Sequence, residues 1–434
     1  MSDAVRGTRK WGRVALLVVA AIAMAALAAV VTVAGTLEGW WQSPVAPRGD
    51  TKAFLAAANA EIDARSHGNT AFVLLEHGKP VGSHFVSKGK PVNGDTLFQV
   101  ASLSKWITAM GVMKLVEEGK LDLDAPVSKY LKRWKLPDSK FDNSKVTIRR
   151  VLSHTAGLTD GLGYAGFEPG KKVQTLEESL TRTADASPGA SGLVRVGIEP
   201  GTKFKYSGGG YTMLQLIIED VTGRDFNEFM RAEILVPFGM THSTFVLNAV
   251  PNPDVAEIYD TDGSFATHYK FTALAAASLY TCTSDLMHFI QAQLPGPNGE
   301  AAGRGILKPQ TLATMRMPEA SMLGAEIWGL GTILYAPNNA GGFIVGHDGN
   351  NAPAINTAAR FDPASGDGIV VLETGADLLA SKVAADWVFW RTGYVDLIAF
   401  QAGMRRMLNV ATIAAGIAFL LTLVVGWRFT RRRT

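Results

Sequence analysis

The chain has one cysteine, Cys282, among its 434 residues, so it cannot form an intrachain disulfide. It also lacks the H-E-x-x-H pattern of zinc hydrolases and the G-x-S-x-G pattern of ester hydrolases. A glycine-rich phosphate loop is absent as well. We therefore expect neither a metal nor a cofactor, and any catalysis is left to ordinary side chains.

The body of the protein lacks a net positive charge. The formal net charge is +3, but residues 1–13 and 428–434 together carry +7, so the residues between them sum to −4. A mildly acidic body argues against nucleic acid as a partner.

Long hydrophobic runs, in contrast, are present near both ends. Residues 14–37 and 407–427 are uncharged, and each matches the roughly 20 residues that a helix needs to cross a bilayer. A cleaved signal peptide is the alternative for the first run, which is longer than a signal core of about 7–15 residues. Basic residues precede the first run and follow the second, which predicts cytoplasmic tails at 1–13 and 428–434. The region after a linker at 38–49 would then lie outside the cytoplasm, on an inner-membrane anchor.

The region 50–395 has strand signals at both ends and helical signals in its middle. Asp50 is a plausible N-cap for a first helix, and the apolar runs at 70–78 and 80–87 predict a β-hairpin. Later elements are predicted at 210–223 and 284–294 (helices), at 328–336, 342–347, 354–362 and 368–374 (strands), and near 376–392 (a helix). This order predicts one α+β domain whose sheet joins its two ends.

The stretch QVASLSKWITAM places Ser102 and Lys105 three residues apart at the start of a predicted helix. Residues at this spacing share a helix face, so Lys105 can approach the Ser102 hydroxyl. The helix N-terminus favours a developing oxyanion, and burial of Lys105 would make its amine a usable base. An N-cap serine beside a solvated lysine is the alternative. A second S-x-x-K match, Ser87 to Lys90, lies in a charged connection where rigid geometry is not expected.

Several ordered segments give the chain a resemblance to a known family. Residues 101–131, 148–161, 199–223, 235–245 and 345–375 are similar, in order and spacing, to the serine β-lactamase and penicillin-binding-protein-like hydrolases. The similarity is greatest to the class C, D-aminopeptidase and esterase side of this family. It implies an antiparallel sheet flanked by helices with a helical subdomain. It also implies that Ser102 forms an acyl-enzyme with an ester or amide.

The sequence departs from the family's second motif, Tyr-x-Asn. None of the nine tyrosines has an asparagine two residues later. By resemblance, Tyr206 takes the tyrosine position and Gly208 replaces the asparagine; a packed structural tyrosine is the alternative. A tyrosine with a pKa of about 10 is a poor base unless an ammonium group stabilises its phenolate. We therefore interpret Lys105 and Tyr206 as one unit and leave open which of them is the base.

The third motif is Lys-Thr-Gly in lactamases and often His-x-Gly in the peptidase and esterase branches. His347, Asp348 and Gly349 match the second form at the end of a predicted strand. The resemblance implies that the backbone N–H of Asn350 forms an oxyanion hole with that of the nucleophile. A structural role is the alternative for His347, and we interpret His154 as part of the loop architecture.

The third motif also predicts substrate preference. Lactamases hold a substrate carboxylate there with a lysine and a hydroxyl, whereas a neutral His347 and an anionic Asp348 would not. We expect penicillins to be poor substrates, and an uncharged or amine-bearing ester or amide, small or from the cell envelope, to be preferred. A true β-lactamase or D-Ala-D-Ala carboxypeptidase is one alternative. A non-catalytic protein that binds or senses an envelope ligand is another. The oligomeric state is not predicted.

Overall fold

The computed structural model describes residues 2–161, 163–322, 324–352 and 354–431. It divides into two compact units, Val45–Thr392 and the paired segments Met1–Pro44 and Gly393–Thr434. The parts of the predicted basic tails at Met1 and at 432–434 lie outside the described residues.

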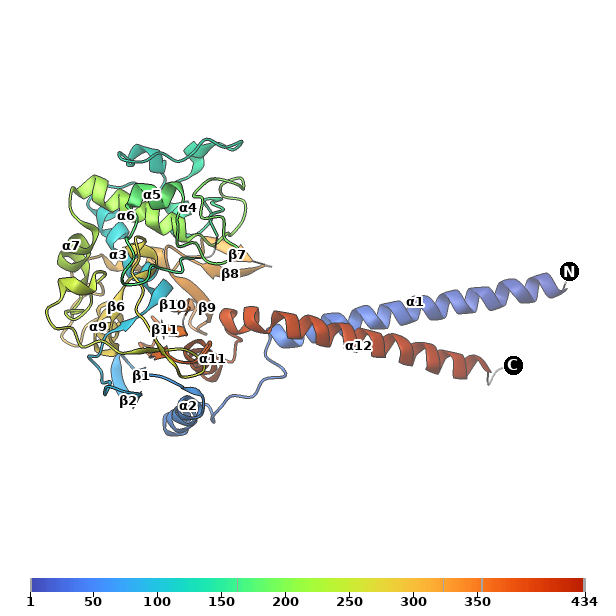
Figure 1. Cartoon of the computed structure of the whole chain (residues 1–434). Coiled ribbons are helices and arrows are strands. Elements are labelled where there is room, and N and C mark those ends of the chain that lie inside the picture. Colours follow the sequence, from blue (N-terminus) through green and yellow to red (C-terminus); the bar gives the residue numbers. More distant parts are fainter. Residues whose placement is uncertain (1, 162, 323, 353, 432–434) are drawn as a thin grey trace. The chain divides into compact units, whose positions relative to one another are not determined.

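An eight-stranded antiparallel sheet forms the centre of the larger unit, in the order β2-β1-β12-β11-β10-β9-β8-β7 (Figure 1). Its strands are β1 (Thr70–Glu76), β2 (Lys79–Val86), β7 (Ala320–Met322), β8 (Ala325–Trp328), β9 (Ile333–Pro337), β10 (Phe343–Asn351), β11 (Ile355–Phe361) and β12 (Gly368–Thr374). β1 pairs with β12, with Thr70 opposite Glu373, so the sheet joins both ends of the unit as predicted. The predicted strand at 328–336 is instead two strands, because Gly331, with φ +74°, turns the chain between β8 and β9.

Two short two-stranded sheets accompany the main one. The first pairs β3 (Phe98–Gln99) with β6 (Tyr280–Thr281), and the second pairs β4 (Ile258–Tyr259) with β5 (Phe265–Ala266).

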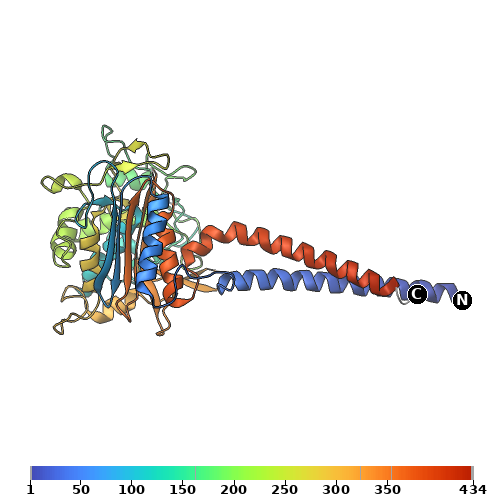
Figure 2. The same cartoon turned by 90° about the horizontal axis from the view of Figure 1, so that it is seen from below.

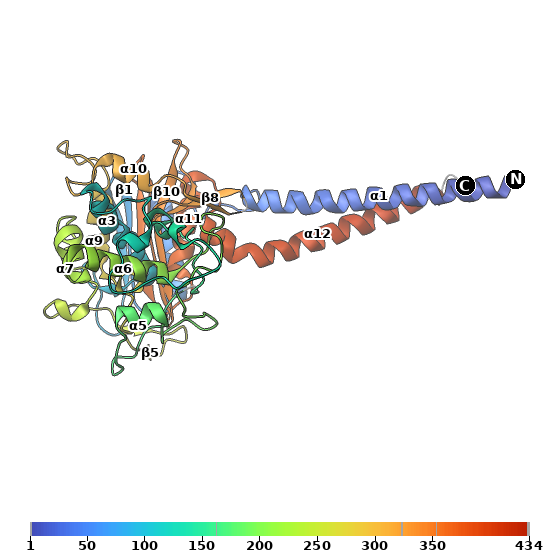
Figure 3. The same ribbon diagram turned by 90° about the horizontal axis from the view of Figure 1, so that it is seen from above.

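Helices cover both faces of the main sheet. Figure 2 shows α2 (Thr51–Arg65) and α11 (Leu379–Thr392) along one face. On the other face, α3 (Ser104–Glu117) and α9 (Thr283–Ala292) share the hydrophobic core with alternate residues of β1. Figure 3 shows α6 and α7 grouped beside α3. The remaining helical segments of this unit are α4 (Ile148–Leu152), α5 (Leu176–Thr181), α6 (Gly208–Thr222), α7 (Phe226–Met230), α8 (Leu274–Ala277), α10 (Pro309–Met315), the 3₁₀ turns η1 (Ala101–Leu103), η2 (Val127–Lys129), η3 (Asn143–Lys145) and η5 (Leu247–Ala249), and the π-helical turn η4 (Arg231–Leu235).

Local sequence signals set the ends of the predicted helices. The Asp50 side chain accepts the N–H of Ala53 at 2.9 Å, so it caps α2 as predicted. α3 ends just before Gly119, which has the left-handed φ of +69° typical of a helix stop. Most residues of α3 are buried, which places Lys105 in its first turn inside the protein.

The smaller unit consists of two long helices, α1 (Ser2–Leu37) and α12 (Leu397–Arg431), which pack along each other. A Cβ added to Gly426 would lie 2.0 Å from Leu17 Cδ1, so the glycine permits this contact. By length and composition, Val14–Leu37 and Gly403–Phe429 could each cross a membrane. Figure 1 shows the first residues of α1 and the last residues of α12 at the same end of this helix pair.

Candidate active site

Ser102 and Lys105 meet where a 3₁₀ turn runs directly into a helix. η1 carries Ser102, α3 carries Lys105, and the lysine Nζ donates to Ser102 Oγ at 3.0 Å. Lys105 Nζ also donates to the Ala276 carbonyl at 2.7 Å, which fixes the amine from a second side. Ala101, just before the serine, has φ +46°, a strained conformation of the kind that clusters at functional sites.

The second S-x-x-K match has no such geometry. Residues 87–90 lie outside regular secondary structure, and Ser87 Oγ accepts the Val92 N–H at 2.9 Å. Its serine is therefore used in a local turn, which agrees with the sequence interpretation.

Burial changes the protonation of Lys105. The residue is only 1% exposed, and this burial lowers its pKa to about 7, although the nearby Asp160 carboxylate opposes the shift. A substantial fraction of the amine is therefore neutral at physiological pH. A neutral amine 3.0 Å from Ser102 Oγ can accept the hydroxyl proton.

Tyr206 reaches the same serine from the extended segment before α6. Its hydroxyl donates to Ser102 Oγ at 2.9 Å, and Lys105 Nζ lies 5.0 Å from the centroid of its ring. Burial raises the pKa of the Tyr206 phenol, so the hydroxyl stays protonated at neutral pH. The structure thus brings Lys105 and Tyr206 together at Ser102. It favours the lysine as the base and the tyrosine as a proton donor.

The ring of Tyr206 is held by aromatic neighbours. His154 lies against it with ring centroids 4.3 Å apart, and the Trp328 ring lies at 5.9 Å. His154 Nδ1 accepts the backbone N–H of Ser207 at 3.2 Å, and His154 itself has φ +57°. These contacts fit the loop role predicted for His154. The sequence did not identify Trp328, because its contact with residues far away in the chain has no local signal.

Asp160 anchors the backbone that follows Tyr206. Its buried carboxylate accepts Ser207 Oγ–H at 2.5 Å and the Gly209 N–H at 2.7 Å. Ser207 is in turn the N-cap of α6, and its Oγ accepts the Gly210 N–H at 2.8 Å. The sequence analysis missed this aspartate, although it lies in the motif-bearing segment LSHTAGLTDG.

The ring of Tyr164 fills the space beside Gly208. A Cβ added to Gly208 would lie 2.9 Å from Tyr164 Cε2, closer than real Cβ contacts. The Tyr164 hydroxyl shares a hydrogen bond of 2.6 Å with Thr212 Oγ1, one turn further along α6. The asparagine of the family motif is therefore not simply missing here, because a tyrosine occupies the space its side chain would enter.

β10 presents His347 and Gly349 toward the segment that carries the serine. A Cβ added to Gly349 would lie 2.0 Å from the Val100 carbonyl oxygen, so only glycine permits this approach. Burial and the neighbouring Lys105 lower the pKa of His347 to about 3, so its ring is neutral. Its Nδ1 lies 2.6 Å from the Asp348 carbonyl oxygen, which can only accept, so Nδ1 carries the hydrogen. Nε2 is left with no hydrogen-bond partner among the described residues.

The prediction that Asp348 repels a substrate carboxylate is wrong. Successive strand residues point to opposite faces, and Asp348 points away from the face of His347 and Gly349. Its Oδ2 accepts from Arg360 Nη2 at 2.7 Å, and its Oδ1 accepts from the Tyr335 hydroxyl at 2.6 Å. Since Arg360 is completely buried and paired with it, the charge of Asp348 is compensated within the protein.

Asn350 is exposed and follows Gly349 in β10. The close approach of Gly349 to Val100 brings this part of the strand to the chain just before Ser102. The oxyanion role of the Asn350 N–H stays a prediction.

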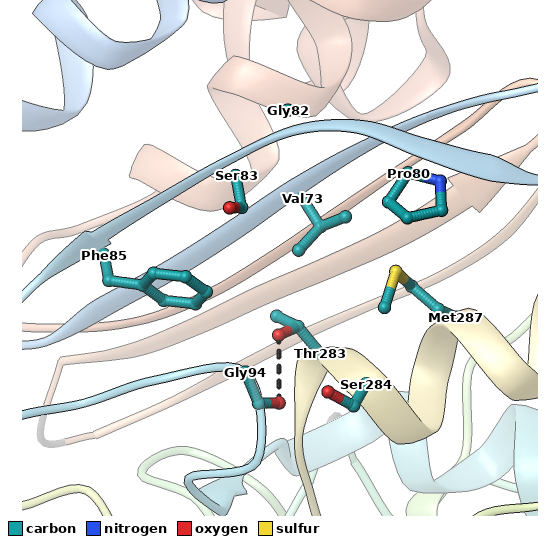
Figure 4. Close-up of a pocket in the computed structure, with 9 residues that line it drawn as sticks. All are labelled: Val73, Pro80, Gly82, Ser83, Phe85, Gly94, Thr283, Ser284 and Met287. Atoms are coloured by element: carbon teal, nitrogen blue, oxygen red, sulfur yellow. Dashed lines mark hydrogen bonds between the residues drawn. The ribbon is translucent and has the colours of Figure 1, made fainter.

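A cavity of about 340 Å³ lies elsewhere, between the sheet and α9 (Figure 4). Of the described residues that line it, none belongs to the predicted site; they are Val73, Pro80, Gly82, Ser83, Phe85, Gly94, Thr283, Ser284 and Met287. Thr283 Oγ1 donates to the Gly94 carbonyl at 3.1 Å across one end of it.

One group of side chains has donor atoms of the types that hold metals. Those of Asp95, His242 and Cys282 lie within 4.8 Å of one another. His242 Nδ1, however, already pairs with Asp285 Oδ1 at 3.0 Å, and burial raises the pKa of the Cys282 thiol. A neutral thiol is a weak ligand, so we assign no metal here.

The chain belongs to the beta-lactamase family, whose model matches residues 55–388. Members of this family are generally serine hydrolases.

Two curated relatives match part of the chain. Protein flp of Staphylococcus aureus (strain MRSA252) is 28% identical over 228 residues, which cover 51% of this chain and 43% of that protein. Penicillin-binding protein 4* of Bacillus subtilis (strain 168) is 34% identical over 178 residues, which cover 40% of this chain and 36% of that protein. The chain thus spans less than half the length of these relatives.

Solved structures share the fold. The octameric penicillin-binding protein homologue from Pyrococcus abyssi matches with a TM-score of 0.62 at 24% identity, over 82% of this chain and 77% of that one. The D-amino acid amidase from Ochrobactrum anthropi SV3, in complex with D-phenylalanine, matches with a TM-score of 0.58 at 21% identity, over 82% of this chain and 98% of that one. These matches confirm the predicted fold class, an antiparallel sheet with flanking helices.

Proposed function

We propose that the protein hydrolyses an ester or amide through an acyl-enzyme on Ser102. One observation carries the proposal: two side chains able to move protons converge on one hydroxyl oxygen. Lys105 Nζ lies 3.0 Å and the Tyr206 hydroxyl 2.9 Å from Ser102 Oγ.

Each residue takes one part in the reaction. Neutral Lys105 accepts the Ser102 proton while Oγ attacks the substrate carbonyl carbon. The backbone N–H groups of Ser102 and Asn350 receive the developing oxyanion. Tyr206 donates its proton to the leaving group, and the proton held by Lys105 replaces it. Water then attacks the acyl ester, its proton passes to the same pair of side chains, and Ser102 is regenerated.

The charges of the residues in β10 indicate the class of substrate. Because Asp348 faces away, His347 is the residue of this motif that disfavours a carboxylate-bearing substrate. Its ring is neutral, with a pKa of about 3, so it supplies no positive charge to hold a carboxylate. An uncharged ester or amide, or one bearing an amine, fits this strand better. The fold shared with a D-amino acid amidase supports an amide as one candidate.

We further propose that residues 50–395 form the hydrolase domain outside the cytoplasm, anchored in the inner-membrane bilayer through 14–37 and 407–427. Two helices of suitable length and apolarity support the anchoring. The start of α1 and the end of α12 lie at the same end of this helix pair (Figure 1), which is compatible with two cytoplasmic tails. The basic residues that flank the spans favour the same orientation.

A chromogenic panel tests the proposal on the full chain in detergent micelles. It contains short-acyl p-nitrophenyl esters, D-amino-acid p-nitroanilides and a chromogenic cephalosporin. We expect turnover of an ester or anilide that Ser102→Ala abolishes and Ser87→Ala, the matched control, retains. Turnover that survives Ser102→Ala contradicts the nucleophile assignment. A cephalosporin as the best substrate contradicts the substrate class, and a wild-type protein that turns over nothing favours a binding or sensing role.

A further inference from the structure

We propose that Asp160 is a positioning residue that holds Tyr206 against Ser102 through the backbone of 207–209 and stabilises the proton on Lys105 through its charge. This inference rests on the serine hydrolase function proposed above and adds to it a residue outside the family's three motifs.

The restraint on Tyr206 depends on the bonds that Asp160 makes to the first residues of α6. Residues 208–210 are three consecutive glycines, so the first turn of this helix has unusual backbone freedom. Asp160 restrains it by accepting from Ser207 Oγ at 2.5 Å and from the Gly209 N–H at 2.7 Å. A Cβ added to Gly209 would lie 3.0 Å from Asp160 Cγ, so the glycine allows the carboxylate to come this close. Tyr206 directly precedes this clamped segment.

The effect of Asp160 on the proton of Lys105 depends on the charges of the groups that face Lys105. In the described part of the chain these are the imidazoles of His154 and His347, the phenols of Tyr206 and Tyr211, and the carboxyl group of Asp160. Burial lowers the pKa of both imidazoles and raises the pKa of both phenols, so all four are neutral near pH 7. Asp160 is left as the anion that opposes the loss of the Lys105 proton.

The pKa of Asp160 lies above its ordinary value because of burial, and its bonded and charged neighbours limit that shift. These neighbours are the donors of Ser207 and Gly209 and the charge of Lys105. Its two donors belong to the N-terminus of α6, a helix of 15 residues whose positive end also favours an anion. Tyr164, another titratable group beside Asp160, remains a neutral phenol because burial raises its pKa.

The test compares three variants of the full chain in detergent micelles. Asp160→Asn keeps the size but removes the charge and one acceptor. Ser207→Ala loosens the clamp but keeps the carboxylate. Asp185→Asn alters another buried aspartate and serves as the matched control.

We expect Asp160→Asn to lower kcat/KM about tenfold or more and to move the midpoint of its acid limb to lower pH by about half a unit or more. The sign follows because protonated Lys105 loses its stabilising anion. Ser207→Ala should lower kcat/KM without moving the midpoint, and Asp185→Asn should change neither. A residue that only stabilises the fold would leave the midpoint in place, so an unmoved midpoint in Asp160→Asn overturns the proposal.

A second measurement separates this inference from the proposed function. If the wild-type protein turns over no substrate and a fluorophosphonate fails to label Ser102, the hydrolase proposal fails. An NMR titration of [ε-¹³C]lysine in the full chain, with Lys105 assigned through Lys105→Met, still decides the role of Asp160. A lower Lys105 midpoint in Asp160→Asn supports it, and an unchanged midpoint contradicts it. Should Asp160→Asn not fold, the carboxyl ¹³C resonance of Asp160 in the wild type decides, because a protonated group at pH 7 contradicts the proposal.

Discussion

Lys105 Nζ lies 3.0 Å from Ser102 Oγ, and the lysine is almost completely buried. A lysine in water keeps its proton at neutral pH, whereas this one has a pKa of about 7. The spacing of the two residues along the chain places the base, and the burial of α3 makes it usable.

The pH dependence of the reaction should report the Lys105 amine. Only neutral Lys105 can accept the serine proton, so kcat/KM should rise with pH, with a midpoint near the Lys105 pKa of about 7. Lys105→Arg should lower kcat/KM by about 100-fold or more, because the guanidinium does not deprotonate. The exposed Lys90→Arg is the control and should have no effect. An acid limb with its midpoint near the pKa of an ordinary carboxylate would contradict Lys105 as the base.

Removal of the Tyr206 hydroxyl should slow the reaction without preventing folding. Tyr206→Phe keeps the ring contacts with His154 and Trp328 but loses the proton donor to Ser102 Oγ. We expect kcat to fall by about 100-fold or more with a much smaller change in KM. Tyr130→Phe, which alters a tyrosine of the core outside this site, should leave kcat unchanged. Equal activity of Tyr206→Phe and wild type would show that the phenol plays no part in proton transfer.

Restoring the family's asparagine at position 208 should destabilise the protein. Gly208→Asn forces a side chain against the Tyr164 ring, and overpacking of this kind costs about 1–3 kcal/mol. Chemical denaturation measures the cost, and Gly170→Asn is the control because a Cβ there meets nothing within 4 Å. In a Tyr164→Ala background the added cost of Gly208→Asn should be smaller. The same cost in both backgrounds would show that Tyr164 does not fill this space.

The ion pair between Asp348 of β10 and Arg360 of β11 should be important for stability. Arg360→Gln leaves the largely buried Asp348 carboxylate without its cation, which should cost about 3 kcal/mol of unfolding free energy. Lys145→Gln, which breaks an exposed pair with Glu199, should leave the free energy of unfolding unchanged within error. The double variant Asp348→Asn/Arg360→Gln should recover part of the loss. If Arg360→Gln unfolds like the wild type, the ion pair does not stabilise the sheet.

The sequence predicted those parts of the site that depend on local spacing or on family motifs. Ser102 and Lys105 meet because residues three apart on a helix are neighbours. Side chains of successive strand residues point to opposite faces of the sheet. The sequence therefore also indicates that Asp348 faces away from His347, which contradicts the role predicted for Asp348. Asp160 and Tyr164 were missed for a different reason. Their partners lie tens of residues further along the chain, at the start of α6, and no short-range pattern specifies such a contact.

The sequence likewise predicts the longer elements of the fold but not the shortest ones. The N- and C-terminal strands were recognised from their apolar runs, and their pairing across the unit followed from the order of elements. The short strands β3 to β6 were not recognised, because two-residue strands leave no periodic pattern. The division of 328–336 into two strands depends on the turn at Gly331, which interrupts an apolar run that by itself indicates a single strand.

The role of Ser102 as the nucleophile is tested most directly by covalent labelling of the full chain with a fluorophosphonate, followed by mass mapping of the modified peptide. We expect one adduct per chain, on Ser102, which forms faster as pH rises through about 7. The adduct should be lost in Ser102→Ala and kept in Ser87→Ala. An adduct on another residue, or labelling that persists in Ser102→Ala, would contradict the assignment of Ser102 as the nucleophile.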